Sequence, residues 1–226
     1  MNPLQIVVLD RDTLVNRPFE FDFPHTLSSY GTTEAHETLV RIRGADIVIT
    51  NKVVISAQAF AENPQLKLVA VTATGVNNVD VEAAKQNGTA VCNIRAYGNE
   101  SVAEHAFMMM ITLMRNLPAY QRDVAAGLWE NSPFFCHLGA PMRDLNGKTL
   151  AIFGRGNIGK TLAAYAQAFK MNVVFAEHKH AQSVRDGYVS FDEAIRSADV
   201  VSLNCPLTPQ TANMIGEAEL QQMKPG

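Results

Sequence analysis

The sequence predicts an α/β fold built on parallel sheets. Apolar runs of strand length alternate with stretches of helical periodicity, which is typical of repeated strand–helix–strand units. The runs are rich in β-branched residues and apolar on both faces, as expected for strands buried in a parallel sheet. In the first part of the chain the expected strands span residues 4–10, 45–50, 66–73 and 89–93.

Composition narrows the class of protein and of ligand. The 226 residues are 47% hydrophobic, enough for the cores of one large or two small domains. The formal net charge of −3 gives no electrostatic reason to expect a nucleic acid or a membrane as partner, which favours a small-molecule ligand. No apolar stretch has spanning length and the N-terminus lacks a signal-peptide pattern, so a cytoplasmic protein is predicted. Three scattered cysteines, Cys92, Cys136 and Cys205, predict free thiols and no metal site.

Helix signals lie between the first strands. A helix with a threonine N-cap is predicted over residues 32–44. A second is predicted over residues 80–88, with Asp80 as N-cap and Gly88 as its stop. These helices alternate with the strands as a parallel sheet requires.

A long apolar helix opens the second part of the chain. Ser101 and Glu104 form a Ser-x-x-Glu capping box at its predicted start, and Pro118 ends it. We expect so apolar a helix to be buried, with its three consecutive methionines as adaptable core filler. Residues 119–146 predict an irregular loop that serves function or contacts a partner subunit. The turn-like segment before Ser101 predicts a domain boundary.

A glycine-rich turn supplies the first functional motif. After a predicted buried strand, Gly154, Gly156 and Gly159 form a Gly-x-Gly-x-x-Gly pattern at the start of a helix. In such a turn the first glycine allows a tight bend, the second lets a pyrophosphate approach the backbone, and the third lets the helix pack closely on the strand. Unpaired N–H groups at the helix N-terminus then face the phosphates, which predicts dinucleotide binding.

An acidic residue at the end of the next strand supports this prediction. Glu177 follows Gly159 by eighteen residues, where a dinucleotide site needs a carboxylate for the ribose hydroxyls. The carboxylate repels a 2′-phosphate, which favours NAD over NADP. Lys179, between two histidines, is a cation that offsets part of this repulsion, so NADP stays an open alternative.

A third unit follows the acidic residue. It predicts a helix over residues 190–198 and a strand over residues 199–207. The polar end of this strand, residues 204–207, is expected to face the cofactor at the carboxyl edge of the sheet. A short helix is expected in the remaining residues.

Several of these stretches together resemble one protein family, the D-isomer-specific 2-hydroxyacid dehydrogenases, and within it the glycerate dehydrogenases, also called hydroxypyruvate reductases. The resemblance spans the whole chain and is far more specific than any single motif. The stretches that carry it are TATGVNNVD (72–80), NESVAEHAFMMMITLMRN (99–116), LNGKTLAIFGRGNIGK (145–160) and ADVVSLNCPLTPQTANMI (198–215).

The resemblance implies a two-domain protein. Residues 1–95 are expected to form a flavodoxin-like substrate-binding lobe. Residues 96–226 are expected to form an NAD-binding domain that contains the first half of a Rossmann doubly wound parallel sheet and is incomplete at its C-terminal end. In this half-sheet, the strand that begins at Lys148 is expected to keep an unpaired flank, an aggregation hazard unless another chain covers it.

The resemblance also implies site residues. The backbone N–H groups of Gly75 and Val76, after Thr74, are expected to bind the substrate carboxylate, since successive N–H groups in a glycine turn can converge on an anion. Lys52, just past another strand end, is an additional substrate-site candidate, with an ordinary surface lysine as the alternative. The positions expected to contact the cofactor, besides the three glycines of the turn, are Thr74, Asn157, Ile158, Glu177, Cys205, Pro206 and Leu207.

The implied reaction is the reversible interconversion of a 2-hydroxy acid and a 2-keto acid, D-glycerate and hydroxypyruvate in the first instance. It needs a histidine to deliver the proton, a glutamate to hold that histidine, and an arginine to pair with the substrate. In the family these groups come after the position of Gly226, so no catalytic residue is expected in this chain, and it is predicted to be inactive alone. None of the six histidines has a sequence neighbour expected to place a carboxylate behind its ring.

Two further expectations concern assembly and an alternative function. Relatives pair through the long helix of the cofactor domain, which implies a homodimer. The alternative function is a truncated, non-catalytic NAD-binding or protein-interaction module, because the family also includes transcriptional corepressors that sense dinucleotides.

Overall fold

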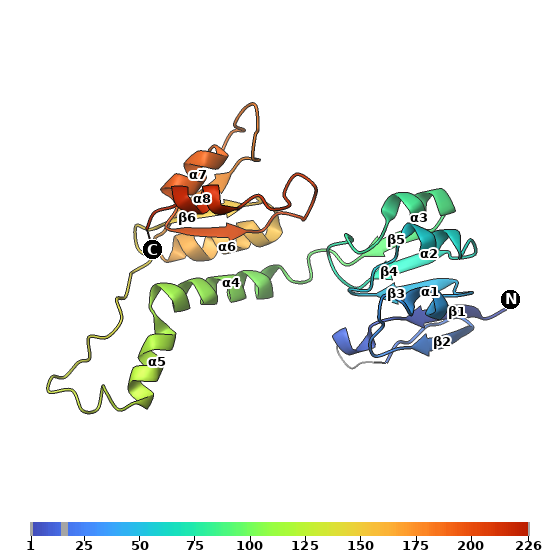
Figure 1. Ribbon diagram of the computed structural model, residues 1–226, viewed down its shortest axis with the longest axis horizontal. Helices are drawn as coiled ribbons and strands as arrows, with labels where there is room; N and C mark the ends of the chain where they lie inside the picture. Colours follow the sequence, from blue (N-terminus) through green and yellow to red (C-terminus); the bar gives the residue numbers. More distant parts are fainter. Residues whose placement is uncertain (1, 15–17, 226) are drawn as a thin grey trace. The chain divides into compact units, whose positions relative to one another are not determined.

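The computed structural model describes residues 2–14 and 18–225, and the chain divides into two compact units, Met1–Tyr97 and Gly98–Gly226 (Figure 1). The sequence places the boundary two residues earlier, between residues 95 and 96. Each unit has its own sheet and its own hydrophobic cores.

The first unit is built on a five-stranded parallel sheet. Its strands are β1 (Leu4–Val8), β2 (His25–Ser29), β3 (Ile47–Thr50), β4 (Leu68–Val71) and β5 (Ala90–Asn93), in the spatial order β2-β1-β3-β4-β5. This is the strand order of flavodoxin-like folds, so the predicted fold class of this unit is confirmed. The sequence did not predict β2, because this edge strand contains a single large apolar residue, Leu27.

Short helices pack on one face of this sheet: α1 (Thr38–Arg41), α2 (Ala57–Ala61) and α3 (Val81–Asn87), with a 3-10 turn at Arg11–Thr13. Asp80 caps α3 by accepting a hydrogen bond from the Ala83 N–H, and Gly88 ends it with φ +76°, as predicted. The predicted helix over residues 32–44 is wrong over its first half. There the Thr33 hydroxyl donates to the Leu9 carbonyl, which ties the segment to the end of β1 and leaves only four helical residues.

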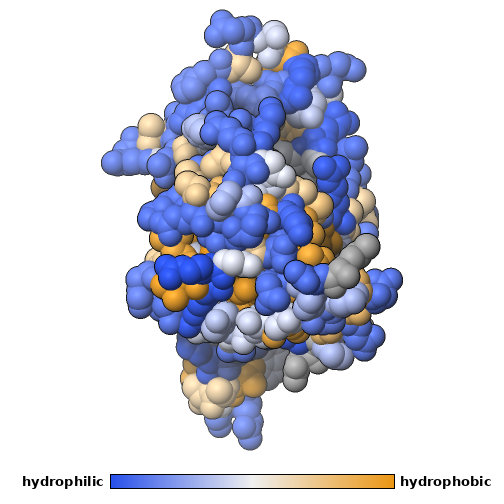
Figure 2. Space-filling model, turned by 90° about the vertical axis from the view of Figure 1, so that its right-hand side faces the viewer, coloured by the Kyte–Doolittle hydropathy of each residue, from blue (hydrophilic) through white to orange (hydrophobic). Residues whose placement is uncertain are grey.

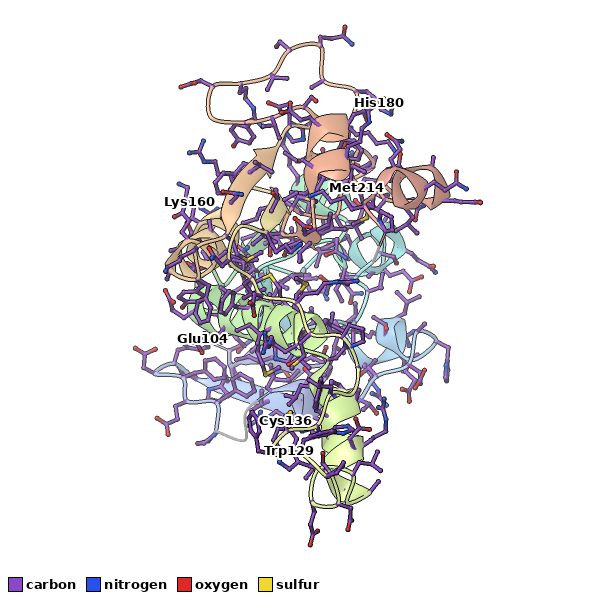
Figure 3. The ribbon with its side chains drawn as sticks, turned by 90° about the vertical axis from the view of Figure 1, so that its left-hand side faces the viewer. Glu104, Trp129, Cys136, Lys160, His180 and Met214 are labelled. Atoms are coloured by element: carbon purple, nitrogen blue, oxygen red, sulfur yellow. The ribbon has the colours of Figure 1, made fainter. Side chains whose placement is uncertain are left out.

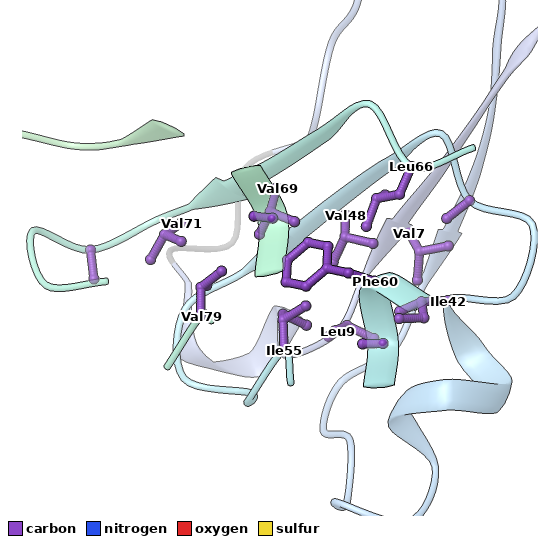
Figure 4. Close-up of a cluster of buried hydrophobic side chains, with 14 residues drawn as sticks. Val7, Leu9, Ile42, Val48, Ile55, Phe60, Leu66, Val69, Val71 and Val79 are labelled. Carbon is purple, nitrogen blue, oxygen red and sulfur yellow. The ribbon is translucent and has the colours of Figure 1, made fainter. Parts of the chain in front are cut away.

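The two faces of the first sheet bury different side chains. Figure 4 shows the larger cluster, in which Phe60 of α2 packs among Val48, Val69 and Ile55. On the opposite face, Ile6, Val8 and Ile49 pack against three phenylalanines of the segment that precedes β2, Phe19, Phe21 and Phe23. Successive side chains of β1 therefore point alternately into these two clusters, as expected for a parallel strand that is covered on both sides.

The second unit is built on a three-stranded parallel sheet. Its strands are β6 (Thr149–Phe153), β7 (Asn172–Ala176) and β8 (Val200–Leu203), in the order β7-β6-β8. Val189 adds one parallel bridge to Ala176 on the outer edge of β7. With that bridge, the order follows the 3-2-1-4 core of dinucleotide-binding sheets. The expectation of an unpaired flank on the strand from Lys148 is wrong, because β6 pairs on both sides.

Helices cover both faces of this sheet. On one face, α4 (Asn99–Met114) and α6 (Asn157–Ala168) pack on Leu150 and Ile152 of β6. On the other face, α7 (Phe191–Ser197) packs on Ala151 and Phe153 of the same strand. A short last helix, α8 (Glu217–Gln222), follows the β8 loop, as predicted.

The helix α4 differs from its prediction in three ways. It begins two residues before Ser101, with Gly98 as N-cap, and the Ser101 hydroxyl bonds back to the Gly98 carbonyl. It ends before Pro118, which lies instead in the first turn of a separate helix, α5 (Leu117–Ala125). Of the three methionines, Met110 is buried, whereas Met108 and Met109 are half exposed. Only one stripe of α4 is therefore core.

Residues 115–144, which we call the arm, project from α4 as α5 and a returning loop. The loop is held by hydrogen bonds from the Arg143 N–H to the Met114 carbonyl (2.8 Å) and from the Tyr120 hydroxyl to the Ala140 carbonyl (3.0 Å). The prediction of an entirely irregular segment missed α5, none of whose residues is buried in a core. Trp129 and Cys136, both labelled in Figure 3, belong to this arm.

Figure 2 shows hydrophilic side chains over most of one face of the chain, with hydrophobic patches between them. Within residues 2–14 and 18–225, no helix combines the length and apolar character needed to cross a bilayer. The three cysteines are unpaired, as predicted.

Candidate cofactor and substrate sites

A pocket lies at the carboxyl ends of the three strands of the second unit. Its wall is formed by the loops that follow β6, β7 and β8. The strands β7 and β8 lie on opposite sides of β6, so the chain changes winding direction at β6, and such switch points are where open α/β sheets bind ligands. The lining includes Gly154, Gly156, Glu177, Cys205 and Pro206 from the predicted cofactor set.

Each of the three positions in the turn is occupied by glycine for a different geometric reason. Gly154 has φ +111°, and a Cβ there would lie 2.7 Å from the Asn204 carbonyl. A Cβ on Gly159 would lie 2.1 Å from the Gly154 carbonyl oxygen, so α6 can approach the turn only with glycine at this position. A Cβ on Gly156 would meet nothing within 4 Å, which leaves its surface open to a ligand.

The N-terminus of α6 faces this open space with free donors. Gly156 is its N-cap, and the helix carries no acidic residue in its first turn. Within the described residues, the N–H groups of Asn157, Ile158 and Gly159 donate to no carbonyl or side chain. Successive unpaired N–H groups at the positive end of a helix form an anion site, which suits the pyrophosphate of a dinucleotide.

Glu177 lies directly after β7 and is buried, with 3% of its surface exposed. The Arg185 guanidinium forms a fork on its carboxylate, with Nε to Oε2 and Nη2 to Oε1 both at 2.7 Å. The N–H groups of His178 and Arg185 donate to the same two oxygens. The Arg185 fork, followed by the His178 N–H, lowers the pKa of Glu177 to about 2, so the carboxylate is ionised at neutral pH.

Two arginines share one aromatic ring beside this carboxylate. The Arg185 guanidinium lies 4.2 Å from the centroid of the Tyr188 ring, and the Arg155 guanidinium lies 5.4 Å from the same centroid. Arg155 also lies over Phe175 at 4.8 Å. All three of Arg155, Arg185 and Tyr188 line the pocket. No sequence pattern pointed to Arg185, because its position depends on how the loop after β7 folds back on Glu177.

The loop after β8 forms the opposite side of the pocket. The Thr211 hydroxyl donates to the Pro206 carbonyl at 2.6 Å and fixes the bend of this loop. The Cys205 thiol lies 3.7 Å from the Met214 sulfur, and Met214, labelled in Figure 3, belongs to the lining. Leu207, a predicted cofactor residue, is exposed and outside the lining. The lining also lacks Asn157, Ile158 and the buried Gly159.

The predicted substrate residues lie in the first unit, at adjacent strand ends. Thr50 ends β3 opposite Val71, which ends β4, so Lys52 and the Thr74–Val76 turn follow neighbouring strands on the same edge of the sheet. The N–H groups of Gly75 and Val76 have no acceptor within the described residues, and the Asn93 side chain donates to the Thr74 carbonyl at 2.7 Å. This turn therefore offers two free donors beside a lysine.

A buried carboxylate positions the Lys52 loop. Asp10 is 4% exposed and accepts hydrogen bonds from the N–H groups of Asn51 (2.9 Å), Lys52 (2.6 Å) and Val53 (3.3 Å). The Lys52 ammonium itself is exposed and has no ion-pair partner among the described residues. The backbone is thus fixed while the charge remains available.

One histidine does have a carboxylate partner, contrary to the prediction. His137 Nε2 lies 2.8 Å from Asp123 Oδ2 in the arm, and a Cβ on Gly139 would clash with Asp123 at 2.5 Å. The two residues are fourteen apart, a separation that only the return of the loop onto α5 closes. No arm residue lines the cofactor pocket.

Comparisons with known proteins agree with this geometry. Residues 107–226 match the family description "D-isomer specific 2-hydroxyacid dehydrogenase, NAD binding domain". The chain is 40% identical over 221 residues to the glycerate dehydrogenase of Methylorubrum extorquens, covering 97% of this chain and 69% of that protein. It is 35% identical over 197 residues to the hydroxypyruvate reductase of Blautia hydrogenotrophica, covering 86% of this chain and 61% of that protein.

Solved structures show the same likeness. A crystal structure of a D-lactate dehydrogenase from Aquifex aeolicus complexed with NAD and lactic acid matches with a TM-score of 0.76 and 26% identity, over 97% of this chain and 66% of that one. A glyoxylate reductase from Paecilomyes thermophila matches with a TM-score of 0.77 and 26% identity, over 99% and 71%. These findings confirm the predicted fold class, the predicted cofactor and, at the level of the family, the predicted oxidoreductase function. The chain therefore belongs to the D-isomer-specific 2-hydroxyacid dehydrogenases, whose cofactor NAD is bound by the domain that its second unit matches.

Proposed function

We propose that this protein is an NAD-dependent dehydrogenase that interconverts D-glycerate and hydroxypyruvate. The observation that carries the proposal is the pocket of the second unit, where the Gly154–Gly159 turn and Glu177 lie at adjacent strand ends. The relatives named glycerate dehydrogenase and hydroxypyruvate reductase support the choice of substrate.

In the proposed complex the cofactor supplies or accepts a hydride at the 2-carbon of the acid. The N–H groups at the start of α6 bind the pyrophosphate, and the Glu177 carboxylate lies where the adenosine ribose is expected. Asn157, Ile158, Cys205, Pro206 and Leu207 are proposed to contact the cofactor from the loops after β6 and β8, and Thr74 from the first unit.

The substrate carboxylate is proposed to bind in the first unit. The free N–H groups of Gly75 and Val76 suit an anion, and the Lys52 ammonium adds a positive charge at the same sheet edge. Asp10 keeps the Lys52 backbone in place. Residues 1–95 would then serve as the substrate lobe and residues 96–226 as the cofactor domain.

We also propose that residues 1–226 on their own bind the cofactor but do not convert the substrate. The one histidine–carboxylate pair of the described residues lies in the arm and away from the pocket lining. A cytoplasmic location is part of the proposal, supported by three unpaired cysteines, which suit a reducing compartment.

The test compares two proteins with hydroxypyruvate and NADH. One is the chain of residues 1–226, and the other is the same chain fused at its end to the part of the Methylorubrum glycerate dehydrogenase that follows the matched region. We expect NADH oxidation in the fusion alone and NADH binding in both. Equal, sizeable rates in both would contradict the proposed absence of the proton-transferring groups, and binding without turnover in both would favour a non-catalytic NAD-binding module.

A homodimer is the proposed assembly, formed through the long helix α4, as the resemblance implies, together with the arm that follows it. Its exposed apolar side chains include Phe134, Phe135 (98% exposed) and Leu138 (87% exposed). An apolar surface of this kind on one projecting segment is typical of a protein–protein contact.

A further inference from the structure

The carboxyl edge of the first sheet carries an arginine in addition to Lys52. We propose that this residue, Arg95, is a second cation of the substrate site and pairs with the substrate carboxylate from the side opposite Lys52. The inference rests on the proposed function, in which the N–H groups of Gly75 and Val76 bind that carboxylate.

Three neighbouring strands end in register at this edge of the sheet. Thr50 of β3 is the register partner of Val71 of β4, and Val71 is the partner of Asn93 of β5, so the three form one row across the sheet. Lys52 lies two residues beyond the row on one side, and Arg95 lies two residues beyond it on the other. The turn that is proposed to bind the carboxylate follows β4, the strand between them.

Two hydrogen bonds hold the residues before Arg95 next to that turn. The Ile94 N–H donates to the Ala73 carbonyl at 3.1 Å. The Asn93 side chain donates to the Thr74 carbonyl at 2.7 Å. Because Arg95 comes directly after both donors, its backbone lies beside the turn even though it is outside any strand.

The charge of Arg95 is available to a ligand. Arg95 is exposed, and its side chain has no ion-pair or hydrogen-bond partner among the described residues. No acidic residue occurs in the three segments at the ends of β3, β4 and β5, which are residues 50–53, 72–78 and 93–97. Asp10, which lies at the end of β1, is buried and already accepts three N–H groups. These three strand ends are therefore positive in a chain whose formal net charge is −3, and they favour an anionic ligand.

The backbone directly after Arg95 is in an unusual conformation. Ala96 has φ +60°, in the left-handed region that residues with a Cβ seldom adopt. Such positions persist where the surrounding structure holds them, and they cluster at binding sites. The conformation of Ala96 therefore supports a ligand-binding role for the segment that contains Arg95.

A guanidinium at this place suits a carboxylate. Its planar N–H groups match the two oxygens of a carboxylate, and the pair forms charge-assisted hydrogen bonds. A guanidinium does not lose its proton in proteins, so Arg95 is expected to bind the substrate and not to transfer a proton. With Lys52 on the other side of the turn, the site would surround one carboxylate with two cations and two backbone donors.

The test measures the dissociation constant of D-glycerate for the full chain by calorimetric titration with NAD present. In Arg95→Gln, D-glycerate should bind at least about fivefold more weakly, because a charge-assisted hydrogen bond is lost. Arg95→Lys keeps the charge and should lose less. Arg43→Gln is the matched control, since this exposed arginine lies before β3, at the other edge of the sheet. A second control, Arg196→Gln, removes an exposed arginine that is paired with Asp192 on α7. Neither control should change the affinity for D-glycerate.

Two further measurements separate the possible failures. NADH affinity and far-UV circular dichroism should be unchanged in Arg95→Gln, which shows that the variant is folded. Lys52→Gln reports on the proposed substrate site independently of Arg95. Weaker D-glycerate binding in Lys52→Gln but not in Arg95→Gln, or an equal loss in Arg43→Gln, would overturn the inference and leave the proposed substrate site standing. No binding of D-glycerate to the unsubstituted chain, or unchanged binding in both Lys52→Gln and Arg95→Gln, would overturn the inference together with that site.

Discussion

At the scale of single residues, the turn after β6 depends on the absence of side chains. Gly159 is the sharpest case, because a Cβ there would lie 2.1 Å from the Gly154 carbonyl oxygen and the backbone has to shift to accept it. Gly156 is the matched case, since a Cβ there meets nothing within 4 Å. Gly159 therefore allows α6 to pack on the turn, and Gly156 leaves space for a ligand to approach the backbone.

The two alanine variants should separate these roles. Gly159→Ala should lower the free energy of unfolding by about 1–3 kcal/mol, the usual cost of forcing extra volume into a packed site. Gly156→Ala should leave unfolding close to unchanged and weaken NADH binding, because the methyl group occupies the approach of the pyrophosphate. Urea unfolding and NADH fluorescence measure both effects, and an unaffected NADH affinity in Gly156→Ala would count against pyrophosphate binding at this turn.

Glu177 also makes stability depend on pH. Its pKa falls from an ordinary value of 4.5 in the unfolded chain to about 2 in the folded protein, chiefly because of Arg185. A lowered folded pKa means that the contribution is fully present above about pH 5 and is lost as the pH falls from there toward 2.

Unfolding measured against pH tests this expectation. The difference in unfolding free energy between the unsubstituted protein and Glu177→Gln should be constant above about pH 5 and should shrink between about pH 5 and pH 2. Glu217→Gln, on the exposed start of α8, is the control. A difference that stays constant down to pH 2 would show that Arg185 does not lower the pKa of Glu177 in the folded protein.

At the scale of elements, the arm is where sequence periodicity predicted least. No residue of α5 is buried, so its apolar residues form no core stripe. The pairing of His137 with Asp123 depends on a loop that brings together residues fourteen positions apart. By contrast, Asp80 and Gly88 marked the ends of α3 correctly, since capping is a local interaction that the sequence carries directly. The sequence predicted helix ends, which depend on neighbouring residues, but it did not predict contacts between segments that lie far apart in the chain.

The proposed dimer contact can be tested on one side chain of the arm. Phe135→Glu should shift the protein from dimer to monomer, because a charge cannot be buried unpaired in an apolar contact. The matched control is Val40→Glu, an exposed apolar position on α1 that should leave the assembly unchanged. Sedimentation velocity at several concentrations measures both. A monomeric unsubstituted protein, or a dimer that survives Phe135→Glu, would contradict the proposed contact.

At the scale of the whole molecule, the alternation of apolar runs and helical stretches was enough to predict two parallel α/β units. The same pattern did not reveal the pairing of β6 with β8, because strand order depends on the crossover from β7 and not on any one strand. For the cofactor pocket, the glycines and Glu177 were readable from spacing. Arg185 was not, because its contact with Glu177 is made by an irregular loop.

The measurement that tests the central claim most directly is calorimetric titration of NADH into the folded chain of residues 1–226. The account predicts saturable binding at one site per chain, weakened in Gly156→Ala and undisturbed in Arg196→Gln. A chain that is folded by circular dichroism and yet takes up no NADH would contradict it.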